Sequence, residues 1–297
     1  MANPLWTVVL AAGAGRRLAD VTGGIPKQFW RGVNGRSLLE QTIDRFSPLA
    51  PPSRTVVVVD ATHRAHMADS ERRRFGRIVY QPGDRGTAAG VLLALTPVLE
   101  SAADSVVAIT PSDHGVIEDA RFRDGVLEAS RYTRSHGAIV LFGVRPSVAL
   151  HDYGWITPGP PRASGAIRAV SSFVEKPTPE RAAQLFEAGA VWNTMVLVGQ
   201  ARAIWDLYAE VLPELGGVFK TAVGLPRAER DDFLASVYPS LPTFDFSRDV
   251  IAPARNLVTY IWPASMGWSD LGTPERLNEW QSRPSAVRPD PLATTAA

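Results

Sequence analysis

The chain has 297 residues, of which 21% are charged, and its formal net charge is only +1. This balance gives no reason to expect a nucleic-acid partner, because surfaces that bind polyanions are usually strongly basic. The sequence contains no cysteine, which excludes disulfides, thiolate metal sites and cysteine nucleophiles. The length suits one elaborated α/β domain, which we expect over residues 1–281.

The first apolar run extends from Leu5 to Ala12, with no basic residue before it and Arg16-Arg17 after it. This order does not fit a secretory signal peptide. No other segment offers the roughly 18 consecutive apolar residues that a membrane-spanning helix needs. We therefore expect a soluble, cytoplasmic protein with no membrane partner.

Apolar, β-branched runs recur in the first half of the chain, with helical spacing between them. They lie at Trp6–Leu10, Thr55–Val59, Ser105–Ile109 and Ala138–Phe142. Runs that are apolar on both faces suit parallel strands covered by helices on each side. The pattern predicts an α/β fold with a doubly wound, mostly parallel sheet.

Two helices have clear start signals. Ser37 and Glu40 have capping-box spacing and predict a helix through Phe46. Thr178-Pro179 predicts the start of another helix, which Gly189 closes.

Two other segments are rich in residues that break regular structure. Residues 154–168 are rich in Gly and Pro and are expected to form loops, before a strand at Ala169–Val174. Residues 282–297 are rich in Pro, Ala and Thr without apolar periodicity, which predicts a disordered tail.

A loop of small residues follows the first predicted strand. It runs Ala11-Ala12-Gly13-Ala14-Gly15, and small side chains let backbone N–H groups approach phosphate oxygens closely. A Gly-x-Gly turn here also begins dinucleotide-binding folds, although Leu18 occupies the place of their third glycine. The loop alone leaves open a phosphate loop, a dinucleotide fold and a simple tight turn.

Seven further blocks follow this loop. They are Pro26-Lys27-Gln28-Phe29, Gln81-Pro82 with Arg85-Gly86-Thr87-Ala88, Pro111-Ser112-Asp113-His114, Tyr153-Gly154-Trp155-Ile156, Phe173-Val174-Glu175-Lys176-Pro177, Trp192-Asn193, and Gly267-Trp268-Ser269-Asp270-Leu271-Gly272. Their types and order resemble the sugar-phosphate nucleotidyltransferase family, and within it most closely the bacterial mannose-1-phosphate guanylyltransferases. The resemblance covers residues 5–275.

The resemblance implies a Rossmann-like nucleotidyltransferase catalytic domain over residues 1–281, with a small antiparallel elaboration that binds the sugar. It implies an enzyme that transfers a nucleotidyl group from a nucleoside triphosphate to a sugar 1-phosphate and releases pyrophosphate. In this branch GTP and mannose 1-phosphate give GDP-mannose. The resemblance is compatible with a homodimer.

The reaction sets two highly charged phosphates against one another, so charge neutralisation and positioning are its main requirements. Mg²⁺ takes hard oxygen ligands and commonly uses one or two protein carboxylates. The resemblance assigns Asp113 and Asp270 to this metal. It assigns Arg17 and Lys27 to the phosphates of the nucleotide.

The resemblance assigns further residues to the two substrates. The nucleotide residues are Ala11, Ala12, Gly13, Gly15, Gln81, Arg85, Gly86 and Thr87, and the sugar-phosphate residues are Gly154, Glu175, Lys176 and Asn193. In a regular strand Glu175 and Lys176 would point to opposite faces, so both can line one site only if the strand ends or bends there. Thr87 fits a helix cap equally well. His114 is expected to be structural, because the nucleophile is already an ionised phosphate.

Several departures from the family patterns bear on the substrates. Ala12 stands for a glycine, Arg16 for a threonine and Gly86 for an asparagine. The same reaction with UTP or dTTP and glucose 1-phosphate therefore stays an alternative, as does a non-catalytic nucleotide-sugar sensor. A dehydrogenase fits poorly, because no acidic residue is suitably placed for a ribose. The role of Thr243–Ser247 stays open.

Overall fold

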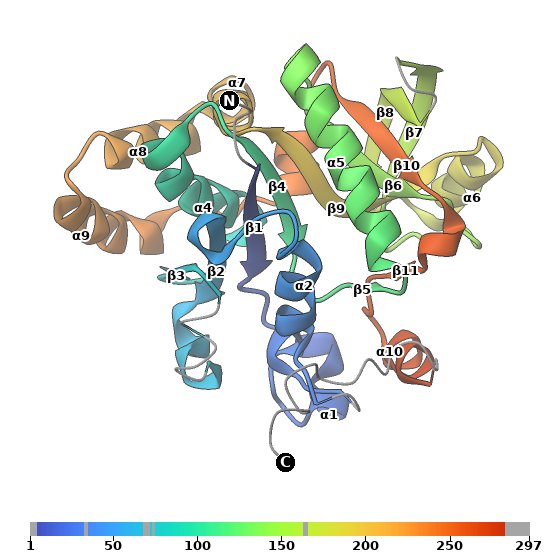
Figure 1. The fold of residues 1–297 in the computed structure, drawn as a ribbon, viewed down its shortest axis with the longest axis horizontal. Coiled ribbons are helices and arrows are strands. Elements are labelled where there is room, and N and C mark those ends of the chain that lie inside the picture. The colour runs from blue at the N-terminus through green and yellow to red at the C-terminus, as the bar shows by residue number, and fades with distance from the viewer. Residues whose placement is uncertain (1–4, 33–34, 68–71, 73–74, 163–165, 283–297) are drawn as a thin grey trace.

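The computed structural model describes residues 5–32, 35–67, 72, 75–162 and 166–282. Among these residues nine strands form one twisted sheet in the spatial order β3-β2-β1-β4-β9-β6-β10-β8-β7 (Figure 1). The α/β class predicted from the sequence is confirmed. None of the helices in the described part of the chain has the length and apolar character needed to cross a bilayer.

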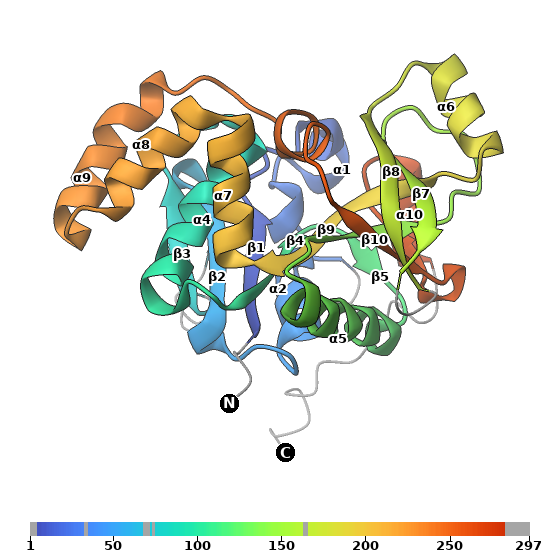
Figure 2. The ribbon, with the colours of Figure 1, turned by 90° about the horizontal axis from the view of Figure 1, so that it is seen from above.

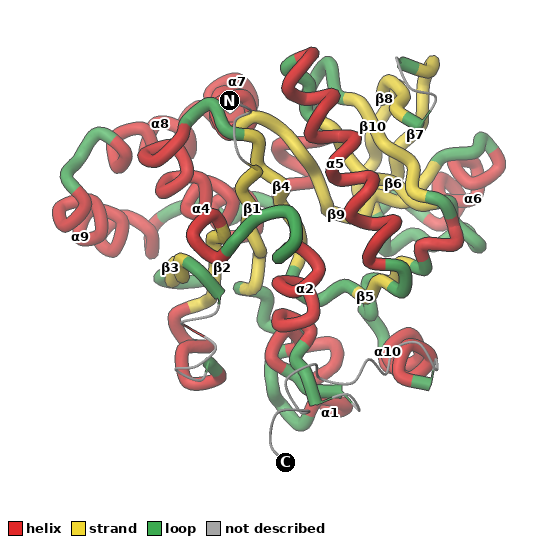
Figure 3. Tube along the Cα trace, in the orientation of Figure 1, coloured by secondary structure: helices red, strands yellow, loops and turns green. Residues whose placement is uncertain are grey.

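One half of the sheet is parallel and alternates with helices along the chain (Figure 3). Its strands are β1 (Leu5–Ala11), β2 (Thr55–Asp60), β3 (Arg77–Gln81) and β4 (Val106–Pro111). Each pairs with its neighbour in parallel, so the carboxyl ends of these strands lie at the same edge. The sequence analysis predicted β1, β2 and β4, each with bounds within two residues of those observed, but not β3.

The other half is largely antiparallel. It contains β6 (Val140–Val144), β7 (Gly154–Pro161), β8 (Ile167–Glu175), β9 (Val191–Gln200) and β10 (Val258–Trp262). Antiparallel pairs join β9 to β4, β6 and β7, and join β8 to β7 and β10, whereas β10 and β6 are parallel. The sheet is therefore mixed, and the expected mostly parallel sheet is wrong. Burial on both faces makes a central strand apolar whichever way it runs, so the apolar runs did not reveal strand direction.

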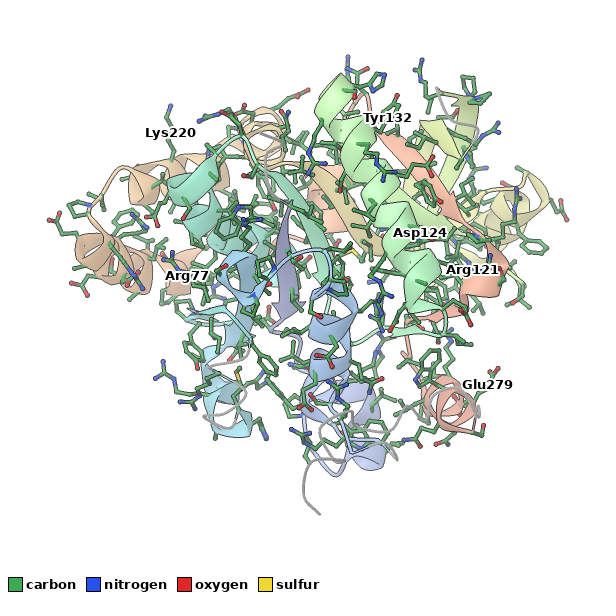
Figure 4. The ribbon with its side chains drawn as sticks, viewed as in Figure 1. Arg77, Arg121, Asp124, Tyr132, Lys220 and Glu279 are labelled. Atoms are coloured by element: carbon green, nitrogen blue, oxygen red, sulfur yellow. The ribbon has the colours of Figure 1, made fainter. Side chains whose placement is uncertain are left out.

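Successive residues of each strand enter different cores. Trp6 and Val8 pack with α4 (Gly86–Ala102), α7 (Ala201–Val211) and α8 (Pro213–Val223). Val9 packs with α2 (Leu38–Phe46) on the opposite face, where α5 (Asp119–His136) covers the other half of the sheet (Figure 2). The outer side of α5 carries the exposed side chains of Arg121 and Asp124 away from the sheet (Figure 4).

The remaining named elements lie around the edges of the sheet. They are α1 (Ala19–Thr22), α6 (Pro179–Glu187), α9 (Arg227–Val237), α10 (Pro274–Gln281), the short antiparallel pair β5 (Gly115–Val116) and β11 (Trp268–Ser269), and a π-helical turn at Phe246–Ile251. Both predicted helix starts are confirmed. Ser37 and Glu40 form the two hydrogen bonds of a capping box, and the Thr178 side chain caps α6.

The loop expected over residues 154–168 is wrong, because β7 occupies Gly154–Pro161. The pairing of β7 with β9 is limited to Trp155 and Ile156, so the proline-containing end of β7 pairs with β8 alone. A strand that is unpaired on one side tolerates proline, because that side of its backbone needs no ladder hydrogen bonds. Apart from Ser282, the tail predicted at 282–297 lies outside the described residues.

Candidate active site

Two adjoining cavities lie at the carboxyl-end edge of the parallel strands. The larger has a volume of about 520 Å³, and its lining includes Ala12, Gly13, Gln81, Gly86, Thr87 and Asp113. The smaller has a volume of about 220 Å³, and its lining includes Gly154, Glu175, Lys176, Asn193 and Asp270. Thr87, His114, Met195 and Asp245 line both. Most of the residues selected from the sequence are thus brought to one composite site.

The small-residue loop is held in place by Gln28. Its amide nitrogen donates to the carbonyl of Ala11 at 2.8 Å and to that of Gly13 at 2.9 Å. Gly15 has a φ of +63°, and a Cβ there would lie 2.8 Å from the backbone nitrogen of Lys27. Because the loop and the Pro26–Phe29 block pack directly on one another, a side chain at position 15 would separate them.

Lys27 contacts both residues that are candidate metal ligands. Its ammonium, which is almost fully buried, lies 3.1 Å from a carboxylate oxygen of Asp113 and donates to the backbone carbonyl of Asp270. The carboxylate of Asp270 accepts a 2.7 Å hydrogen bond from the Tyr153 hydroxyl and two from Arg276. Four segments far apart in the sequence thus meet at one point between the cavities.

These contacts keep the two carboxylates ionised. Burial alone would raise the pKa of Asp113, but Lys27 and His114 hold it below its usual value. Burial acts on Asp270 in the same way, and there His114, the Tyr153 hydroxyl and Arg276 lower the pKa. Burial lowers the pKa of His114 to about 4, so its imidazole is neutral near pH 7. A neutral imidazole that faces two carboxylates fits the structural role expected for it.

The carboxylates of Asp113 and Asp270 suit a hard divalent cation. Within the described ranges, no group of three or more His, Asp and Glu side chains gathers to form a larger ligand set. Mg²⁺ needs only one or two protein carboxylates, because it completes its shell with water and substrate phosphates. Two ionised carboxylates beside cavities of this size therefore fit Mg²⁺ better than a metal that requires a full protein cage.

The end of β8 brings Glu175 and Lys176 to the same cavity. β8 stops at Glu175, and Lys176 takes a left-handed φ of +44°, which breaks the alternation of side chains. The Lys176 ammonium lies 3.6 Å from a Glu175 carboxylate oxygen, and its side chain is 62% exposed. Burial, with Asp245 nearby, raises the pKa of Glu175 above its usual value.

Gly154 and Asn193 form part of the same wall. A Cβ at Gly154 would press against the carboxylate of Glu175, its register partner, so the glycine leaves room for that side chain. Asn193 is buried, and its side-chain amide oxygen Oδ1 accepts from the backbone nitrogen of Met195 at 3.2 Å.

At the start of α4, two of the predicted nucleotide residues that line the larger cavity contact the protein's own backbone. The hydroxyl of Thr87 accepts a 2.8 Å hydrogen bond from the backbone nitrogen of Phe246. Gly86 has a φ of +78°, and a Cβ there would overlap the carbonyl oxygen of Phe244. Residues 243–247 thus pack across the first turn of α4, and Thr243 and Asp245 line the cavity.

Four predicted residues besides Lys27 are not among the described residues that line either cavity. Ala11 is buried at the end of β1, and Gly15 packs on Lys27. Arg85 donates to the backbone carbonyls of Tyr238, at 3.2 Å, and Pro239. Arg17 is exposed, in the turn that follows the loop.

Sequence reasoning missed Asp84, Arg276 and the bracing role of Gln28. Gln28 and Asp84 sit inside or beside blocks already recognised, so closer attention to those blocks could have found them. Arg276 lies in the first turn of α10, six residues beyond Asp270. No sequence signal marks it, because a Pro-Glu-Arg helix start usually faces solvent.

Comparisons with known proteins identify the family and several relatives of this chain. The family model described as nucleotidyl transferase matches residues 6–284. Mannose-1-phosphate guanylyltransferase RfbM of Salmonella typhimurium is 29% identical over 280 residues, which cover 90% of this chain and 56% of that protein. Alginate biosynthesis protein AlgA of Pseudomonas putida is 29% identical over 279 residues, covering 89% and 56%. The chain thus spans little more than half the length of these curated relatives.

A solved structure is also similar. The crystal structure described as mannose-1-phosphate geranyltransferase from Thermus thermophilus superposes with a TM-score of 0.82 at 27% identity. The match covers 94% of this chain and 79% of that one.

Proposed function

Because the chain belongs to the nucleotidyl transferase family, we propose that it transfers a nucleotidyl group from a nucleoside triphosphate to a sugar 1-phosphate. The substrates we propose are GTP and mannose 1-phosphate, and the products are GDP-mannose and pyrophosphate. The observation that carries this proposal is the pair of adjoining cavities with Lys27, Asp113 and Asp270 at their junction.

The two cavities suit the two substrates of this reaction. The larger would hold the nucleotide, with its phosphates against the backbone of Ala12 and Gly13, and the smaller the sugar phosphate. A phosphate oxygen of the sugar phosphate attacks the α-phosphorus, an O–P bond forms, and the bond from that phosphorus to the β-phosphate oxygen breaks. Pyrophosphate leaves with the electron pair. The attacking oxygen carries no proton, so no general base is required.

The chain's cations and carboxylates would then have distinct tasks. Lys27 would neutralise phosphate charge at the junction, and Arg17, directly after the loop, would contact the outer phosphates. Lys176 would bind the phosphate of the sugar substrate. Asp113 and Asp270 would hold Mg²⁺, which supplies neutralisation of the facing phosphates when it is bound.

The sugar itself would be recognised by the acceptors of the smaller cavity. Glu175 and Asn193 line it beside Gly154, and sugar hydroxyls are good donors to carboxylate and amide oxygens. The raised pKa of Glu175 reflects burial, and a buried acceptor discriminates strongly because an unpaired one costs free energy. Mannose is our proposal because the relative RfbM is named a mannose-1-phosphate guanylyltransferase.

The proposal is tested by a matrix of nucleoside triphosphates against sugar 1-phosphates, with released pyrophosphate measured at saturating Mg²⁺. We expect GTP with mannose 1-phosphate to give the highest kcat/KM. If UTP or dTTP with glucose 1-phosphate is preferred, the guanylyl and mannose assignments fail and only the reaction class stands. If no pair releases pyrophosphate, the enzymatic proposal itself fails.

A further inference from the structure

We call the part of the larger cavity lined by Gln81, Asp84, Gly86 and Thr87 its nucleobase end, and it presents few free side-chain groups. Gly86 has no side chain and no room for one, because Phe244 packs over it. The Thr87 hydroxyl already accepts from the backbone of Phe246, and Arg85 is held by backbone carbonyls elsewhere. Among the described residues of the 81–88 block that line this cavity, the side chains of Gln81 and Asp84 are left to contact a base.

Both of these side chains present acceptors. The amide nitrogen of Gln81 donates to the carbonyl of Gly83 at 2.8 Å. Its Oε1 lies 3.1 Å from where a Cβ of Gly90 would stand, so the oxygen faces the start of α4. Asp84 is acceptor-only when ionised. One of its oxygens, Oδ1, accepts from the backbone nitrogen of Gly86 at 3.0 Å.

The contact with Gly86 orients the Asp84 carboxylate without exhausting it. A carboxylate has about four lone-pair sites, and the Gly86 N–H occupies one of them. Asp84 is the carboxylate of this cavity that flanks Gln81 and Gly86 in the chain, whereas Asp113 and Asp245 line the part shared with, or next to, the smaller cavity. It therefore brings a fixed negative acceptor to the nucleobase end.

We propose that Asp84 selects guanine, by accepting hydrogen bonds from the N1–H and the N2 amino group of the base. This inference rests on the proposed function and names the group that would give it its base specificity. Guanine carries two adjacent N–H donors on one edge, and a carboxylate accepts such a pair in parallel. Uracil and thymine offer one N–H between two carbonyl oxygens, and adenine offers a ring nitrogen lone pair beside its amino group. Either edge would set a lone pair against the carboxylate.

The test compares equilibrium binding of GDP, IDP, XDP and UDP to the wild-type chain and to Asp84→Asn, by calorimetry. IDP lacks the 2-amino group, and XDP carries a carbonyl oxygen in its place. Asparagine keeps an oxygen for the Gly86 N–H but replaces the other oxygen with a donor. The exposed Asp124→Asn on α5 is the matched control, and thermal melts of all three proteins report folding.

We expect the wild-type chain and Asp124→Asn to bind GDP at least roughly tenfold more tightly than IDP, the effect of one lost bond to a charged acceptor. In Asp84→Asn we expect the GDP:IDP ratio to fall close to one. We also expect binding of XDP to improve about tenfold, because its 2-carbonyl can accept from the new amide.

Three results would overturn the inference. The first is an unchanged ratio of GDP affinity to IDP affinity in Asp84→Asn. The second is an equal loss of affinity for all four nucleotides, which would show that Asp84 only stabilises the loop. The third is tighter binding of UDP than of GDP by the wild-type chain, which would overturn the guanylyl proposal as well. Pyrophosphate release from UTP in the substrate matrix would separate that case from loss of the reaction class.

Discussion

One guanidinium nitrogen of Arg276 donates to both carboxylate oxygens of Asp270, at 3.0 and 3.2 Å. The other terminal nitrogen donates to Asp152 at 3.2 Å, and the guanidinium lies 5.0 Å from the ring centre of Tyr153. Tyr153 itself donates to Asp270. The carboxylate proposed as a metal ligand is therefore oriented by a cation and a phenol that come from different parts of the chain.

Arg276→Gln should weaken metal binding more than substrate binding. Loss of a partner that orients a metal ligand typically costs about 10–100-fold in metal affinity or activity. We expect the Mg²⁺ concentration for half-maximal rate to rise within this range, while the KM for each substrate changes less. Initial rates over a Mg²⁺ titration measure this. Arg276→Lys keeps the charge but cannot bond Asp270 and Asp152 through two separate nitrogens, so its Mg²⁺ dependence should be impaired as well. A normal Mg²⁺ dependence in both variants would contradict an orienting role.

Asp113→Asn and Asp270→Asn should each reduce kcat by at least about 100-fold, because each removes a proposed direct metal ligand and not merely a residue that orients one. Turnover at saturating Mg²⁺ is the measurement. Asp113→Asn also leaves the buried Lys27 ammonium without its carboxylate, so its melting temperature should fall as well. Near-parental turnover in either variant would remove that residue from the proposed metal site.

Lys176→Ala and Arg17→Ala should differ in their kinetic effects. Lys176 would bind a charge already present in the ground state, so its loss should raise the KM for the sugar phosphate by roughly 10–150-fold, the value of one charge-assisted hydrogen bond. Arg17 would meet charge that develops on pyrophosphate, so its loss should chiefly lower kcat. Steady-state kinetics with each substrate varied distinguish the two patterns. Lys220→Ala, exposed on α8, is the control (Figure 4), and the reverse pattern would exchange the assignments.

Gly86→Ala should destabilise the protein, whereas Gly83→Ala should not. Position 86 combines a φ of +78° with a backbone carbonyl where the new Cβ would stand, and nothing lies within 4 Å of a Cβ at Gly83. The left-handed conformation alone costs about 1–2 kcal/mol, so the melting temperature should fall by at least roughly 2–4 °C. Gly86→Asn should also destabilise the protein, because its Cβ would overlap the same carbonyl oxygen of Phe244. Equal melting temperatures for the two alanine variants would show that the Phe244 segment yields easily.

His114 should make stability depend on pH in the acidic range. Its pKa is about 4 in the folded chain against 6.5 when unperturbed, so between these values the unfolded chain binds a proton that the folded chain refuses. Stability therefore rises as pH increases from about 4 to 6.5 and is lost as pH falls. Urea unfolding at several pH values should give a flatter profile for His114→Asn than for the parent. His136→Asn, at the exposed end of α5, should keep the parental slope.

The sequence predicted the parts of the molecule whose causes are local. The capping box at Ser37 and the strand ending in the Ala11–Gly15 loop depend on neighbours within a few residues. The structure also brings the blocks around Asp113, Glu175 and Asp270 to the two adjoining cavities, and their roles there stay predictions.

What the sequence left unpredicted depends on long-range contacts. The direction of β9 is set by its partners β4 and β6, and an apolar strand gives no sign of direction. Arg85 was expected to bind the nucleotide, but its side chain donates to carbonyls more than 150 residues further along the chain. The sequence did not predict a role for Arg276 either, because only folding brings its partners Asp152 and Tyr153 to it.

The position of β9 also constrains the order in which the sheet can be completed during synthesis. β9 pairs with β4 on one side and with β6 on the other, yet it begins 80 residues after β4 ends. Until residues 191–200 have been synthesised, β4 has an open edge, with unpaired N–H and C=O groups that favour association with other chains. Closure of that edge must await a contact of long sequence separation, which is intrinsically slow to form. Before β9 joins the two halves of the sheet, the edge of β4 that it later covers is thus open to aggregation.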